Sequence, residues 1–134
     1  MTVLDTRTMV ADAQGRVEGL TPTDLSAALD GEALLIDVRE REERRNAGTL
    51  PGSVSVPRGL IEFFADPNSE QHRPEFDMNR RLILFCDNGA RSALAADVLL
   101  RMGFWRVAYL EGGLAGWTGE GRDIDALEAS ARGL

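Results

Sequence analysis

One stretch of the sequence, RLILFCDNGARS at residues 81–92, limits the folds open to this chain more than any other. It begins with four apolar residues, Leu82 to Phe85, which have arginines before them and turn-forming residues after them. A short, continuous apolar run of this kind is typical of a strand buried in a parallel sheet. Residues 90–102 then have the amphipathic spacing of a helix. We therefore expect the thiol of Cys86 at the end of a strand, facing the start of a helix.

The remainder of the chain repeats this alternation of strand and helix. Short apolar segments predict further strands at residues 18–20, 33–38, 53–56 and 107–110. Helical spacing or capping residues predict helices at residues 6–17, 21–31, 40–46 and 60–65, and a terminal helix within 123–134. Gly112-Gly113 starts a further short segment that contains Leu114 and Trp117. Strands that alternate with helices in this way predict an α/β fold, with a parallel sheet covered by helices on both faces.

Composition narrows the range of functions. At 134 residues the chain is long enough for one domain with a single core. Its net charge of −7 argues against nucleic acid or an anionic membrane surface as the main partner. All fifteen basic residues are arginine, which excludes lysine nucleophiles and Schiff bases. Cys86 and His72 are the single cysteine and histidine, so neither an internal disulfide nor a cysteine-rich or histidine-rich metal site is expected.

The sequence shows no targeting pattern. Its first ten residues lack the charged and apolar regions of a signal peptide, and no apolar stretch approaches the length of a membrane span. We therefore expect a cytoplasmic protein, because a free thiol survives in that reducing compartment.

The loop after Phe85 has the composition of an anion-binding site. A thiol attacks as its thiolate, and here the backbone N–H groups of residues 88–92, the start of a helix and the guanidinium of Arg91 all favour negative charge. Gly89 permits the tight curl that this requires. Asp87 opposes it, by about 1 kcal/mol if exposed. A lone cysteine after an apolar strand is most often an inert buried residue, but this combination of neighbours favours a nucleophile.

Several motifs, in order, resemble the rhodanese (sulfurtransferase) family. The C-x4-R-S pattern in CDNGARS and the following ALAADVLLRMGFWRVAYLEGGLAGW resemble the second half of that domain, and LLIDVREREE and TLPGSVSVP resemble its first half. The resemblance runs from about Leu20 to Arg122. It implies a sheet of about five strands, a rhodanese domain at 18–122, and extensions at 1–17 and 123–134 that we expect to be helical. It implies no cofactor.

The resemblance also implies roles for individual residues. Cys86 would carry a persulfide, with Asp37 and Arg39 bracing its loop by charge pairing and Gly112-Gly113 and Trp117 packed nearby. The residues of the persulfide-binding and substrate-binding loop would be Asp87, Asn88, Gly89, Ala90, Arg91 and Ser92.

Three positions depart from the family or add to it. Thr49 stands where the family often has a histidine. Asp87 stands where thiosulfate-preferring relatives often carry a basic residue, which weakens the case for a small dianion as the sulfur donor. Arg58 follows a strand end and could reach the site, although a solvated arginine is the simpler interpretation.

Three functions follow. The first is a sulfurtransferase that moves sulfur from a small donor to cyanide, a small thiol or a protein thiol; with one cysteine, it needs an external acceptor. The second is phosphatase or arsenate reductase chemistry, but such loops have five residues between cysteine and arginine, whereas four separate Cys86 from Arg91. The third is a non-enzymatic sulfur carrier with one protein partner. None of these predicts an oligomeric state.

Overall fold

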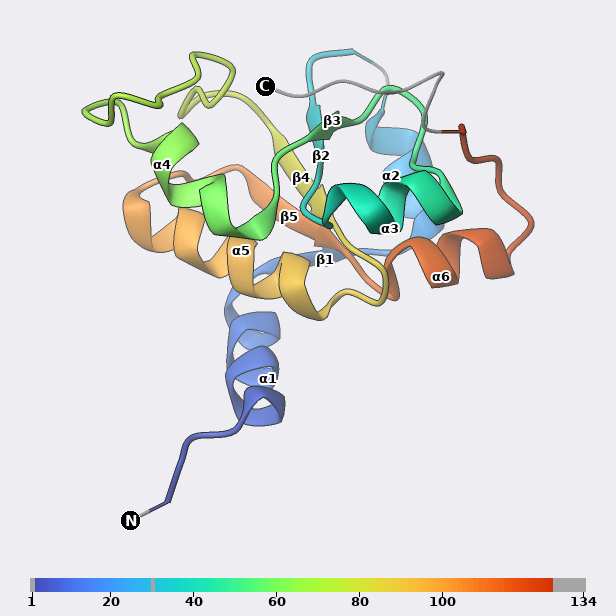
Figure 1. Ribbon diagram of the computed structural model, residues 1–134, viewed down its shortest axis with the longest axis horizontal. Coiled ribbons are helices and arrows are strands. Elements are labelled where there is room, and N and C mark those ends of the chain that lie inside the picture. The colour runs from blue at the N-terminus through green and yellow to red at the C-terminus, as the bar shows by residue number, and fades with distance from the viewer. Residues whose placement is uncertain (1, 30, 127–134) are drawn as a thin grey trace.

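A five-stranded parallel sheet forms the centre of the computed structural model, which describes residues 2–29 and 31–126 (Figure 1). The strands are β1 (Glu18–Leu20), β2 (Leu34–Asp37), β3 (Val54–Ser55), β4 (Leu82–Phe85) and β5 (Val107–Leu110). They lie in the order β1-β5-β4-β2-β3, and every neighbouring pair is parallel. Every residue of β2, β4 and β5 is buried, as their apolar runs predict. The predicted α/β fold with about five parallel strands is therefore confirmed.

Helices connect the strands and begin or end at residues suited to those positions. They are α1 (Thr6–Arg16), α2 (Pro22–Ala28), α3 (Arg41–Ala47), the 3-10 turn η1 (Arg58–Leu60), α4 (Ile61–Ala65), α5 (Ala90–Met102) and α6 (Gly113–Gly119). Thr21 caps α2 through a capping box with Asp24. Gly103 ends α5 in the left-handed conformation that glycine adopts without strain.

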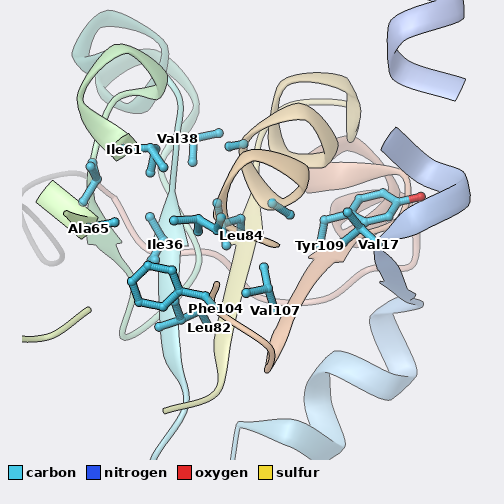
Figure 2. Close-up of a cluster of buried hydrophobic side chains, with 14 of the residues drawn as sticks. Val17, Ile36, Val38, Ile61, Ala65, Leu82, Leu84, Phe104, Val107 and Tyr109 are labelled. Atoms are coloured by element: carbon cyan, nitrogen blue, oxygen red, sulfur yellow. The ribbon is translucent and has the colours of Figure 1, made fainter. Parts of the chain in front are cut away.

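The sheet separates two apolar clusters. Alternate strand residues point to opposite faces, so Ile36 and Leu84 belong to one cluster while Leu35 and Ile83 belong to the other. Helices α1, α4 and α5 supply the first cluster, part of which is drawn in Figure 2, and α2 and α6 supply the second. Parallel strands end at one edge of the sheet, so the loops after β2 and β4 start side by side.

The two ends of the chain extend this core. Helix α1 projects from the body of the molecule, with the N-terminus directed outward (Figure 1). The predicted terminal helix at 123–134 falls largely outside the described residues. Within it, residues 123–126 are not helical, and Asp125 forms an antiparallel bridge with Thr49. No helix in the described ranges combines the length and apolar character required to cross a bilayer.

Candidate functional site

The loop between β4 and α5 curls around the sulfur of Cys86. The N–H groups of Gly89 and Ser92 donate to Sγ at 3.1 and 3.4 Å, and the Ser92 hydroxyl oxygen lies 3.4 Å from the same atom. Gly89 has φ of +97°, so glycine is required for this curl. Asn88 supports the turn by accepting from the Ala90 N–H at 3.0 Å. N–H groups aimed at sulfur stabilise negative charge on it.

Cys86 is completely buried, whereas the next two residues, Asp87 and Asn88, are exposed. The sulfur therefore lies beneath the loop, at the carboxyl edge of the sheet. A reagent that reaches Sγ has to pass the exposed part of the loop.

The Arg91 side chain is held by a carboxylate from a different helix. Its two terminal nitrogens donate to the two carboxylate oxygens of Glu43, in α3, both at 2.7 Å. These hydrogen bonds lower the pKa of Glu43 to about 2, and the same contact raises the pKa of Arg91. The sequence pattern did not identify Glu43, because a residue 48 positions before Arg91 within the charged run REREERR resembles any solvated helix face.

Asp37 and Arg39 form a buried ion pair, each 1% exposed. Nε and one terminal nitrogen of Arg39 donate to the two oxygens of Asp37 at 3.1 and 2.9 Å, and that nitrogen also donates to the Gly48 carbonyl at 2.6 Å. Thr49, in the position where the family often has histidine, donates its hydroxyl to Asp37 at 2.8 Å. The pair is therefore hydrogen-bonded to the segment that follows α3, the helix that contains Glu43. Its bracing effect on the Cys86 loop itself stays a prediction.

Helix α6 supports the loop from the other side. The N–H groups of Leu114 and Ala115 donate to the carbonyls of Cys86 and Asp87 at 2.8 and 2.9 Å. A Cβ on Gly113 would lie 2.5 to 2.6 Å from backbone atoms of those same two residues. The glycine motif that the sequence placed near the site therefore contacts the loop backbone directly.

Arg58 lies on the outer side of α5. Its guanidinium donates to Glu62 at 2.9 Å, and it lines a cleft together with Leu94 and Arg101 of α5. Among its described contacts none joins it to Cys86, and its part in substrate binding stays a prediction.

Comparison with known proteins assigns this geometry to a family. A model of the rhodanese-like domain matches residues 21–120. The chain belongs to the rhodanese-like family. A sulfurtransferase from Allochromatium vinosum is 31% identical over 97 residues, which cover 72% of this chain and 82% of that protein. The chain spans only 24% of the Mycobacterium tuberculosis protein called probable adenylyltransferase/sulfurtransferase MoeZ, which is 31% identical over 100 residues.

Two solved structures that resemble this chain have names that point to different reactions. The human single-domain sulfurtransferase TSTD1 is 26% identical with a TM-score of 0.67, over 78% of this chain and 97% of that one. A protein of unknown function from Rhodopseudomonas palustris, named a possible tyrosine phosphatase, is 34% identical with a TM-score of 0.86, over 93% of this chain and 97% of that one. The comparisons therefore show the family, whereas the reaction depends on the geometry around Cys86.

Proposed function

We propose that this rhodanese-like protein is a sulfurtransferase in which Cys86 carries the transferred sulfur as a persulfide. The observation that carries the proposal is the convergence of the Gly89 and Ser92 N–H groups and the Ser92 hydroxyl on one sulfur atom. Donors arranged this closely suit a single anionic sulfur better than a tetrahedral oxyanion. The sulfurtransferase relatives support the same reaction.

The reaction has two balanced steps. The Cys86 thiolate attacks the outer, sulfane sulfur of a donor; an S–S bond forms to Sγ, and the bond to the donor breaks with its electron pair leaving on the donor. A thiolate or cyanide acceptor then attacks the same sulfane sulfur, and Cys86 leaves as a thiolate. Because the chain has no second cysteine, the acceptor must be another molecule. We expect the protein to act in the cytoplasm, where a thiol nucleophile stays reduced.

The other loop residues have supporting roles in this proposal. Backbone N–H groups between Asp87 and Ser92 hold the persulfide. Asp37 and Arg39 fix the segment that follows α3. They thereby help to position α3, whose Glu43 binds the side chain of Arg91. Arg58 would contact the sulfur donor only if the donor extended from Cys86 across α5.

Phosphoester chemistry is the second candidate, because the Rhodopseudomonas palustris neighbour is named a possible tyrosine phosphatase. That chemistry requires an arginine directed at the phosphoryl oxygens, whereas the Arg91 fork faces Glu43. Only four residues separate Cys86 from Arg91, which also leaves a smaller loop. Both features favour sulfur transfer.

One experiment separates these functions. The reduced protein is incubated with thiosulfate, mercaptopyruvate or an organic persulfide, and its intact mass is measured before and after cyanide, in parallel with Cys86→Ala. We expect the gain of one sulfur atom, lost on adding cyanide and absent in the variant. Repeated turnover with cyanide would distinguish an enzyme from a carrier that loads once. No adduct with any donor, together with Cys86-dependent hydrolysis of an aryl phosphate, would refute the proposal.

A further inference from the structure

The charge at the mouth of the Cys86 loop differs from what the sequence of the loop alone indicates. Arg91 is the only basic residue within residues 86–92. Its guanidinium is bound by Glu43 through two hydrogen bonds of 2.7 Å, and Asp87, the residue after Cys86, is exposed. These three side chains contribute one positive and two negative charges, so together they leave one net negative charge. The ion pair of Asp37 and Arg39 is neutral as a unit and changes nothing in this count.

A dianion meets two obstacles at such a site. It is repelled by the net negative charge, and the Arg91 guanidinium that would attract it already has its charge neutralised by the bidentate Glu43 carboxylate. The Glu43 carboxylate stays ionised at any pH at which the protein would work, because its pKa is held near 2. Glu43 therefore still neutralises the charge of Arg91 at neutral pH.

We propose that Glu43, by neutralising Arg91, is a specificity-determining residue that makes the Cys86 loop disfavour dianionic donors and prefer an organic persulfide. This inference rests on the proposed sulfur transfer. Thiosulfate carries two negative charges, whereas an organic persulfide carries at most one, as RSS⁻, and in its protonated form RS–SH the outer sulfur that is attacked is uncharged. The Cys86 thiolate bonds to it, the RS–S bond breaks, and RS⁻ leaves with the electron pair.

Glu43 acts through Arg91, so it is a positioning residue and its effect should depend on the charge of the donor. The test measures the rate of Cys86 persulfidation by quenched intact mass, with thiosulfate and with 2-hydroxyethyl persulfide as donors. Glu43→Gln keeps an oxygen that can accept from the Glu40 N–H, a bond that the wild-type carboxylate makes at 3.0 Å, but removes the charge. We expect it to load from thiosulfate about fivefold to tenfold faster than wild type, and from the persulfide within about twofold of the wild-type rate.

Two further variants isolate the cause. Glu42→Gln removes the same charge from the neighbouring residue of α3, whose side chain is 75% exposed and lies 4.0 Å from Arg45, and should leave both rates unchanged. Glu43→Asp restores the charge and should restore the wild-type preference. An equal change with both donors in Glu43→Gln, or no change with either, would overturn the inference.

Salt dependence gives a second measurement that needs no variant. Thiosulfate loading of the wild-type protein should become faster as salt is added, because screening weakens repulsion between like charges. A rate that falls with salt would mean that the loop mouth is effectively positive, and would overturn the inference even if Glu43→Gln failed to fold. If wild-type Cys86 loads from neither donor, the proposed sulfur transfer itself is wrong, which is a different result from a wrong donor preference.

Discussion

At the scale of residues, single charged side chains near Cys86 can change which sulfur donors the site accepts. The sulfur receives two backbone N–H groups that any residue sequence with the same curl could supply. Among the side chains around these N–H groups, that of Asp87, the residue after Cys86, is exposed. A side chain that makes no hydrogen bond to the sulfur can still change which donors approach it.

Reversing the charge of Asp87 should therefore improve turnover of a dianion. We expect Asp87→Arg to raise kcat/KM for thiosulfate several-fold, because a repulsion on the order of 1 kcal/mol becomes an attraction. Steady-state assays with cyanide as the acceptor would measure it. Glu32→Arg is a matched control, since Glu32 is exposed and precedes β2, at the opposite edge of the sheet from Cys86. An unchanged or lower kcat/KM for Asp87→Arg would count against the electrostatic account.

At the scale of elements, α6 supports the loop that follows Cys86. Its first N–H groups bind the carbonyls of Cys86 and Asp87, and this close approach is possible only because Gly113 lacks a Cβ and adopts φ of +58°. We expect Gly113→Ala to lower the free energy of unfolding by about 2 kcal/mol or more and to slow Cys86 persulfidation at least tenfold. Urea denaturation and quenched intact mass would measure the two effects.

Gly119→Ala is the matched control for Gly113→Ala. Gly119 ends the same helix, and a Cβ there would have no atom within 4 Å. That variant should keep the loading rate and fold at least as stably as wild type, since alanine favours helix over glycine. If both variants lost stability and loading rate to a similar extent, the cause would be a general effect of substitution in α6 and not the loss of its contact with the Cys86 loop.

The elements were largely predictable from the sequence, while the contacts between them were not. The apolar run before Cys86 is a local signal, and it forms β4 where a strand was expected; the caps Thr21 and Gly103 are likewise local features of the sequence. Pairing between Arg91 and Glu43 depends on where the fold places α3 relative to the start of α5, and spacing along the chain contains no information about that distance. The same holds for Asp125, which lies in a segment expected to be helical and instead bridges to Thr49.

At the scale of the whole molecule, α1 belongs to the fold although it lies outside the family match at residues 21–120. Ala13 is completely buried in the cluster that also contains Val17 and Tyr109. Arg16 fastens the end of the helix to Asp97 of α5 by hydrogen bonds of 2.8 and 2.7 Å. Since α5 begins at the Cys86 loop, we infer that α1 stabilises the layer of helices that supports this loop without contacting the sulfur.

A charge introduced on the buried face of α1 tests this inference. Ala13→Glu would place a carboxylate in the apolar cluster, and should lower the free energy of unfolding by about 2 kcal/mol or more, because a buried charge without a partner is costly. Ala11→Glu changes the net charge equally from an exposed position of the same helix and should stay within about 0.5 kcal/mol of wild type. Urea denaturation of the three proteins would measure the difference. If both variants were equally stable, α1 would be a dispensable appendage, and the domain would be stabilised by the sheet and the helices after it alone.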